Sequence, residues 1–276
     1  MTYQTLKLRR DGQILHVDFD NPPLNLMSIQ MVGELFDLAG KLAVDRETKV
    51  VIFGSANPDF FIAHFDLNDI LNSIVDPGAT QSRYDDINAL QAVSTMWQTL
   101  PQVTIGVVDG ICRGGGLEFL LALSMRFTTP ESRFCFPEAS GGFLPAGGGT
   151  TRLAMQIGPA RALEVMLSSR DFSGEEAAEY GIVNRAIPRN ELNVYIDTLA
   201  RSVAKRSPGA IAAVGGVIKD VHQPMVESLF AGFARENSEL KTLLAIPAVN
   251  DSLKKLASLL DYEHELDLPA TIAAAQ

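Results

Sequence analysis

The sequence predicts an α/β protein built from repeating units of two short strands and a helix. Short, almost continuously apolar runs alternate with longer segments in which apolar residues recur at the helical period. After about Leu192 the strand-like runs end, and an Ala- and Leu-rich helical pattern continues almost to the C-terminus. We therefore expect two parts, a β-β-α core over residues 1–192 and a helical region over residues 193–276.

The first elements expected are a β-hairpin and a helix. Residues 5–8 and 14–19 alternate polar and apolar side chains, and Asp11-Gly12 between them is a hairpin turn signal. Ser28 can accept a hydrogen bond from the first turn of a helix over about residues 29–42, whose apolar residues are spaced for one buried face.

The middle of the chain repeats these signals. Asp66 can cap a helix after the apolar run at residues 60–65, and Ser173-Gly174-Glu175-Glu176 is typical of another helix start. The other elements expected, in order, are a buried strand at 50–53, a loop at 76–82, a helix at 87–100, a strand at 103–108, a turn at 110–116, a helix at 117–126, a further strand, turn and helix within 133–157, and a short strand after Gly181. Residues 269–276 are expected to fray.

Composition and charge limit the classes of partner. With 46% hydrophobic and 20% charged residues, the chain can bury a globular core. A net charge of −10 argues against nucleic acid as the main partner, because phosphate binding needs a basic face, but it permits one anionic ligand. The longest apolar run is too short to cross a membrane, no secretory signal is present, and Cys112 and Cys135 lie in apolar surroundings. We therefore expect a cytoplasmic protein without disulfides or membrane partners.

Two glutamates, Glu118 and Glu138, each lie in a glycine-rich segment. Carboxylates beside exposed backbone N–H groups are suited to reactions next to a carbonyl. The carboxylates can transfer protons while the N–H groups stabilise the oxyanion that develops on the carbonyl oxygen. Plainer interpretations stay open when each residue is taken alone. Glu118 is also typical of an acid that stabilises a helix N-terminus, Glu138 of an exposed loop acid, and Gly114-Gly115-Gly116 of a tight turn.

The other ionisable residues point to no metal or nucleophile chemistry. The remaining histidines are scattered without metal-ligand spacing, and the glycine turn lacks the Lys-Ser/Thr of a phosphate-binding loop. His64 is expected to be a packing or hydrogen-bonding histidine, and Arg113 a cation at the surface or at the edge of a ligand site.

At these residues the chain resembles the crotonase (enoyl-CoA hydratase/isomerase) superfamily over nearly its whole length. The resemblance rests on five segments that occur in family order, namely residues 61–67, 109–118, 136–148, 158–162 and 177–183. It implies a spiral of β-β-α units followed by a C-terminal helical region used in trimerisation, as homotrimers or homohexamers. It also implies an acyl-CoA thioester as the substrate, with no cofactor beyond the coenzyme A that the substrate carries.

The resemblance also assigns roles to residues. The backbone N–H groups of Phe65 and Gly115 would form the oxyanion hole for the thioester carbonyl. Glu118 would activate water for addition at Cβ, and Glu138 would protonate Cα, which is the pattern of a 2-enoyl-CoA hydratase. The residues expected to line the substrate site are Ala63, His64, Asp66, Leu67, Gly114, Pro137, Pro145 and Ala146.

Several positions depart from the family pattern. His64 stands where glycine is usual, Phe65 where alanine is common, and Ala146 in place of a glycine near the water site. The segment at residues 22–25 lacks the basic residue that many members place near the CoA phosphates. An enoyl-CoA isomerase, or another crotonase reaction on a specialised acyl-CoA, is therefore the main alternative, and a non-catalytic acyl-CoA-binding member is a third.

Overall fold

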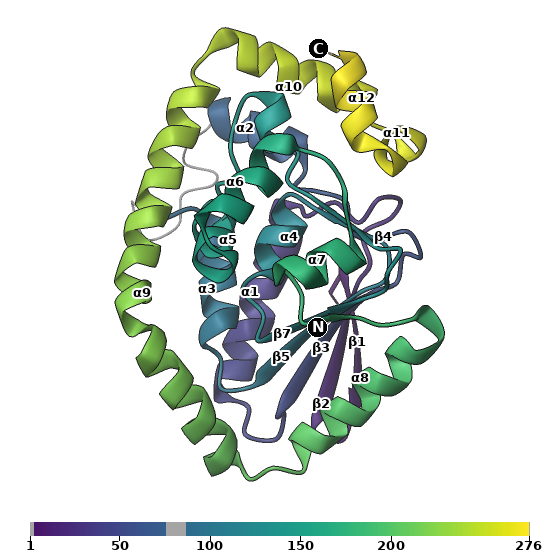
Figure 1. The fold of residues 1–276 in the computed structure, drawn as a ribbon, viewed down its shortest axis with the longest axis vertical. Coiled ribbons are helices and arrows are strands. Elements are labelled where there is room, and N and C mark those ends of the chain that lie inside the picture. The colour runs from purple at the N-terminus through teal and green to yellow at the C-terminus, as the bar shows by residue number, and fades with distance from the viewer. Residues whose placement is uncertain (1–2, 76–86, 276) are drawn as a thin grey trace.

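The computed structural model describes residues 3–75 and 87–275, and its strands form two sheets (Figure 1). The first sheet has six strands in the order β1-β2-β3-β5-β7-β10, and the second has four in the order β4-β6-β8-β9. The strands are β1 (Leu6–Asp11), β2 (Ile14–Phe19), β3 (Val50–Ser55), β4 (Phe60–Ile62), β5 (Val103–Val108), β6 (Ile111–Arg113), β7 (Met125–Thr128), β8 (Arg133–Cys135), β9 (Phe172–Ser173) and β10 (Arg185–Ala186).

Successive pairs of strands divide between the two sheets, which confirms the predicted β-β-α repeat. The pairs β3 and β4, β5 and β6, and β7 and β8 each give one strand to each sheet, and the strands pair in parallel within their sheets. The helices that follow are α2 (Leu67–Val75), α3 (Ala89–Thr99), α4 (Gly115–Leu120), the 3₁₀ turn η2 (Glu138–Gly141), α5 (Gly149–Ile157), α6 (Pro159–Ser168) and α7 (Gly174–Tyr180). The chain therefore winds as a spiral of stacked turns.

Alternating residues of the central strands face two cores. In β3, Val51 and Phe53 belong to the core shared with α3, α4 and α1 (Ile29–Val44), whereas Val50 and Ile52 face α8 (Arg189–Ala204). This period of two is the pattern expected of a strand buried on both faces. The Ser28 side chain accepts a hydrogen bond from the Met31 N–H, so the predicted cap of α1 is confirmed.

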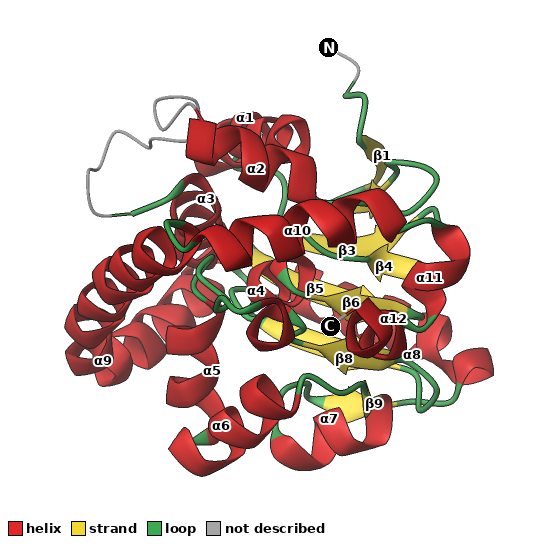
Figure 2. Ribbon diagram, turned by 90° about the horizontal axis from the view of Figure 1, so that it is seen from above, coloured by secondary structure: helices red, strands yellow, loops and turns green. Residues whose placement is uncertain are grey.

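The C-terminal part is helical, as predicted. The helix α9 (Pro208–Leu244) runs along one side of the molecule, and α10 (Pro247–Leu259), α11 (Tyr262–Leu266) and α12 (Leu268–Ala275) fold back across one end (Figure 1). Seen from that end, these three helices lie over β4, β6 and β8 (Figure 2). Within the described ranges, no helix combines the length and apolar character that a bilayer span would need.

Three expectations about local structure are wrong, and one is untested. The predicted turn at 110–116 contains β6, and the predicted helix at 117–126 ends at Leu120 because Met125 and Arg126 pair with β5. The predicted frayed tail is largely the helix α12, whose Leu268 and Ile272 are buried against Leu256. The loop predicted at 76–82 lies outside the described residues.

Candidate active site

A glycine turn brings the end of β4 against the start of α4. Gly114 has a φ of +47°, a conformation that favours glycine. A Cβ on Gly116 would lie 2.5 Å from the Cβ of Ile62, and a Cβ on Gly115 would lie 3.1 Å from the Cβ of Phe65. The absence of side chains in this turn therefore allows Gly115 and Phe65 to lie next to each other.

The backbone N–H groups of Phe65 and Gly115 lie at this meeting point. The chain around Phe65 is fixed, because the Met27 N–H donates to the His64 carbonyl and the Asp66 N–H donates to the Met27 carbonyl, both at 2.9 Å. Within residues 3–75 and 87–275, neither free N–H group has an acceptor. Two free N–H donors on adjacent segments are what a developing oxyanion requires.

Glu118 is buried in α4 and held by the second glycine-rich segment. Its residue is 4% exposed, and its Oε1 accepts hydrogen bonds from the N–H groups of Gly147 at 2.6 Å and Gly149 at 2.9 Å. Burial and the nearby charge of Glu236 raise the pKa of Glu118 to about 8, although the two N–H donors and Arg152 act in the opposite direction. Because Oε1 accepts both bonds, Oε2 is the carboxylate oxygen that remains available to accept a proton.

Glu138 lies at the start of η2 and is 8% exposed, so it is not an exposed loop acid. A Cβ on Gly114 would lie 3.0 Å from its Oε1, which places the carboxyl group beside the glycine turn. Its Oε2 is buried and has no hydrogen-bond partner among the described residues. Burial, followed by the charge of Glu118, raises the pKa of Glu138 well above its usual value. The structure thus brings both glutamates to one buried site.

The two carboxyl groups have different environments. Two N–H donors from other residues stabilise the ionised form of Glu118, whereas among the described residues only the N–H of Glu138 itself stabilises the ionised form of Glu138. Hydrogen bonds to a carboxylate favour its charged form. Glu118 is therefore the better base of the pair, and Glu138 is the residue that more readily stays protonated.

A third buried carboxylate, Glu236 of α9, was not expected from the sequence. It is 2% exposed and accepts hydrogen bonds from the N–H groups of Gly148 at 2.9 Å and Thr151 at 2.7 Å, and from the Gln91 side chain at 2.9 Å. It holds the N-terminus of α5 and thereby the segment that binds Glu118. The signal in the sequence is its place on the apolar stripe of α9, seven residues after the buried Leu229.

Two of the expected substrate residues, Pro145 and Ala146, lie buried next to this segment. The Ala146 carbonyl accepts a hydrogen bond of 2.6 Å from the side chain of Asn88, which also caps α3 and donates to the side chain of Asn237 in α9. Pro137, also buried, directly precedes Glu138. These residues therefore lie in the two segments that position the glutamates.

The residues around the end of β4 that were expected to line the substrate site have different environments. Ala63 is fully buried in a small cluster with Phe60 and Ile111. Asp66 accepts a hydrogen bond of 2.8 Å from the Asn68 N–H at the start of α2. Leu67 is half-buried and contacts the cluster formed by α10 and α12. His64 is 7% exposed and hydrogen-bonded through both ring nitrogens, which confirms that it is a hydrogen-bonding histidine.

Arg113 is buried, so the expectation of a surface or ligand-edge cation is wrong. Its residue is 0% exposed, and its Nε and Nη2 donate to the two carboxylate oxygens of Asp171 at 2.8 and 2.6 Å. Its Nη1 donates to the Glu265 carbonyl at 2.6 Å. The pairing residues lie 58 and 152 positions away, which explains why local sequence did not reveal them.

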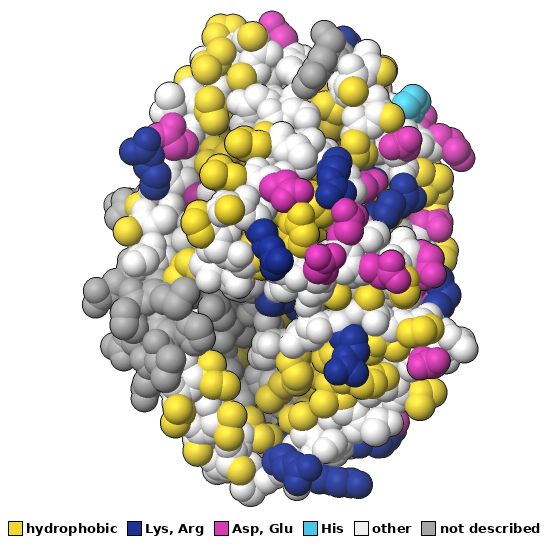
Figure 3. Space-filling view, viewed as in Figure 1, with side chains coloured by type: hydrophobic (Ala, Val, Ile, Leu, Met, Phe, Trp, Pro, Cys, Tyr) yellow, Lys and Arg dark blue, Asp and Glu magenta, His cyan; other side chains and the backbone are white. Residues whose placement is uncertain are grey.

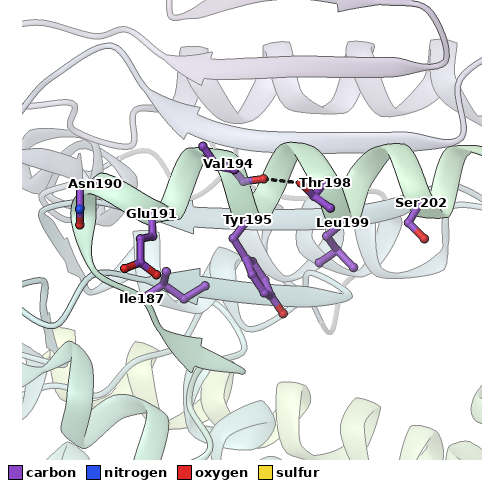
Figure 4. A pocket seen from close by; sticks show the side chains of 8 residues that line it. All are labelled: Ile187, Asn190, Glu191, Val194, Tyr195, Thr198, Leu199 and Ser202. Atoms are coloured by element: carbon purple, nitrogen blue, oxygen red, sulfur yellow. Dashed lines mark hydrogen bonds between the residues drawn. The ribbon is translucent and has the colours of Figure 1, made fainter.

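The surface hollow in Figure 4 is separate from this site. It is lined by Ile187 and by one face of α8 from Asn190 to Ser202, with Val194, Tyr195 and Leu199 among its side chains. None of the expected catalytic or substrate residues lines it.

Comparisons with known proteins agree on one family and one fold. A family model described as enoyl-CoA hydratase/isomerase matches residues 9–254. Carnitinyl-CoA dehydratase of Escherichia coli (strain K12) is 28% identical over 232 residues, which cover 82% of this chain and 85% of the relative. The structure of a candidate enoyl-CoA hydratase from Streptomyces avermitilis has a TM-score of 0.89 and 33% identity, covering 99% of each chain. An enoyl-CoA hydratase from Bacillus halodurans, 21% identical with a TM-score of 0.81 over 91% of this chain and 99% of that one, shares the fold.

Proposed function

This chain belongs to the enoyl-CoA hydratase/isomerase family of the crotonase superfamily, and on that premise we propose that it adds water reversibly to a 2-enoyl-CoA. The product is a 3-hydroxyacyl-CoA. The observation that supports this choice most is the burial of two glutamates at one site where, among the described residues, only Glu118 accepts hydrogen bonds from other residues. A hydratase needs a base and an acid at the same time, and these environments supply one of each.

The proposed reaction begins with the thioester carbonyl between the N–H groups of Phe65 and Gly115. Ionised Glu118 removes a proton from water while the water oxygen bonds to Cβ, and the electron pair of the double bond moves through Cα to the carbonyl oxygen. The two N–H groups stabilise the resulting enolate oxyanion. Glu138 then donates its proton to Cα, which leaves Glu118 protonated and Glu138 ionised, and proton exchange restores the starting state.

The relative from Escherichia coli supports the reaction class. Its name denotes loss of water from an acyl-CoA, which is the same step in the reverse direction. It also denotes a specialised acyl group, and His64, Phe65 and Ala146 depart from the usual family residues at the acyl end of the site. Isomerisation of an enoyl-CoA, which uses an acid at the position of Glu138, is the second candidate.

Incubation with crotonyl-CoA in deuterated water tests the proposal. We expect the conjugated enoyl absorbance to fall and one deuterium to appear at Cα of a 3-hydroxy product. Glu118→Gln and Glu138→Gln should each abolish hydration while acyl-CoA binding survives. Deuterium exchange without hydration would instead favour the isomerase, and normal hydration in both variants would exclude the proposed roles of the glutamates.

Assembly as a homotrimer or homohexamer stays a prediction. It is supported by exposed apolar residues on α8 and α9, among them Val194, Val214, Val217 and Ile218. In Figure 3 apolar side chains gather over the lower part of the face, in the region between α8 and α9 in Figure 1. Sedimentation analysis should give three or six times the chain mass of 29.9 kDa; a single chain mass would contradict the prediction.

A further inference from the structure

A buried histidine–glutamate pair contacts the backbone of Phe65, whose N–H group is part of the proposed oxyanion hole. The Nε2 of His64 is 2.5 Å from Oε1 of Glu265, and its Nδ1 is 2.7 Å from the Phe65 carbonyl oxygen. His64 is 7% exposed and Glu265 is fully buried, although 201 residues separate them. Neither residue has a role in the proton transfers described above.

The two distances determine how many protons the pair holds. A carbonyl oxygen only accepts hydrogen bonds, so Nδ1 of His64 must carry a proton. If Nε2 carried none and Glu265 were ionised, two lone pairs would face each other at 2.5 Å in a buried site. A proton therefore lies between Nε2 and Oε1, so the pair holds two protons and has no net charge.

The surrounding charges are consistent with this count. Burial lowers the pKa of His64, but the charge of Glu265 and the hydrogen bonds to Glu265 and Phe65 together raise it above its ordinary 6.5, against the opposing charge of Arg113. Arg113 is itself neutralised by Asp171. Two further ionisable groups lie nearby. Glu138 lies across Gly114 from His64, and Arg133 donates to the Leu266 carbonyl at 2.9 Å and lies 3.7 Å from Asp171.

Glu265 also connects the two segments that supply the free N–H groups. Its side chain binds His64, the residue before Phe65, and its carbonyl accepts a hydrogen bond from Arg113, two residues before Gly115. The helix α11 thus binds both segments at once. The bond from His64 to the Phe65 carbonyl adds to the bonds from Met27 and Asp66 that already fix this stretch.

We propose that the proton shared by His64 and Glu265 makes this pair a positioning device for the oxyanion hole, an inference that rests on the proposed function. The proton keeps Nδ1–H on the Phe65 carbonyl and keeps α11 attached to both segments. When it is lost at high pH, ionised Glu265 repels Nε2, the contact opens and the Phe65 N–H is no longer held in place. Turnover then falls at a pH set by the pair.

Substitution of Glu265 separates this role from simple packing. The amide of Glu265→Gln can donate to Nε2 without any extra proton, so Nδ1–H stays on Phe65 whatever the pH. We expect this variant to retain at least about a third of the wild-type kcat and to lose the alkaline decline that the pair causes. Glu265→Ala should lose kcat by about ten- to a hundred-fold with little change in KM, part of the loss that removal of one oxyanion donor causes.

His264 on the same helix provides a matched control, since it is half-exposed and pairs with Asp261. His264→Gln should leave kcat and its pH profile unchanged. An alkaline limb in Glu265→Gln identical to that of the wild type would overturn the proposal. So would a loss in Glu265→Ala confined to KM or to thermal stability.

Histidine NMR tests the proton count without any substrate. The chain has four histidines, so His64→Gln identifies the ring signals of His64 in protein labelled with 15N-histidine. We expect protons on both ring nitrogens at pH 7, above the ordinary pKa of 6.5; a ring that lacks its Nε2 proton at that pH would overturn the proposal. Because this measurement does not depend on turnover, it distinguishes failure of the pair from failure of the hydratase function.

Discussion

The carboxylate of Glu236 lies 2.9 Å from the backbone N–H of Gly148, although 88 residues separate the two. The same carboxylate accepts a hydrogen bond from the Thr151 N–H at 2.7 Å. These N–H groups lie at the N-terminus of α5, where a helix leaves donors unsatisfied. The C-terminal helix α9 therefore fixes the segment whose neighbouring N–H groups, those of Gly147 and Gly149, bind the proposed base.

Glu236→Gln should change the pH dependence of turnover. Glu118 acts as a base only when ionised, so kcat/KM is expected to rise with pH towards its pKa of about 8. The charge of Glu236 contributes to that elevation, and its removal should move the rising limb to lower pH. The measurement is kcat/KM against pH. Glu239→Gln, on the exposed side of the same helix, is the control, and coincident limbs in all three proteins would contradict the prediction.

Gly147→Ala should disrupt the site at the glycine-rich segment that binds Glu118. A Cβ at this position would lie 2.7 Å from Oε2 of Glu118 and 2.7 Å from Cγ of Leu90. Because both neighbours are buried, we expect kcat to fall at least about a hundred-fold and the free energy of unfolding to fall by about 1–3 kcal/mol.

Gly33→Ala provides the matched control for that substitution. Gly33 lies in the second turn of α1, where an added methyl group would have no atom within 4 Å other than the backbone of its own helix and its chain neighbours, and alanine is the better helix former. It should raise the free energy of unfolding by about 0.5–1 kcal/mol and leave turnover unchanged. Equal activity in the two alanine variants would show that the segment around Gly147 does not position Glu118.

Local signals were sufficient for much of the fold. The cap at Ser28, the strand at 103–108 and the capping box of Ser173 with Glu176 were predicted correctly because each depends on residues a few positions apart. The strand β6 was missed because it has three residues between glycines and exists through its pairing with β4 and β8. The helix predicted at 117–126 is shortened for the same reason, since tertiary pairing with β5 outweighs helical periodicity.

The candidate site likewise has features that local sequence predicts and features that depend on tertiary contacts. Glu118 and Glu138 were recognisable because each is a lone acid beside a glycine-rich run. The burial of these two carboxyl groups was only partly predictable from the sequence. The residues that surround the site and hold its segments in place were not predictable. Glu236 and Glu265 come from distant helices, and sequence spacing carries no information about such contacts.

Asp171→Asn should destabilise the protein strongly. The Arg113 guanidinium is fully buried and makes two parallel hydrogen bonds to Asp171, so the substitution leaves its charge uncompensated. Breaking such a pair from one side costs about 3–5 kcal/mol, measurable by urea denaturation. Asp197→Asn removes an exposed partner of Arg201 and should have no measurable effect. Equal stability of the two variants would mean that the buried pair does not support the fold.

Glu118→Gln should stabilise the protein at alkaline pH while it abolishes hydration. The folded state raises the pKa of Glu118 from 4.5 to about 8, so between these values it holds a proton that the unfolded chain releases. Stability is therefore fully present below the unfolded pKa and declines as the pH rises towards 8, at up to about 1.4 kcal/mol per pH unit for one group. Glutamine does not titrate, so the gain over wild type in the free energy of unfolding should be larger at pH 8 than at pH 5. The exposed Glu131→Gln should show no such difference. A gain of the same size at both pH values would mean that Glu118 is not protonated in the folded protein at neutral pH, and that burial alone does not hold its proton.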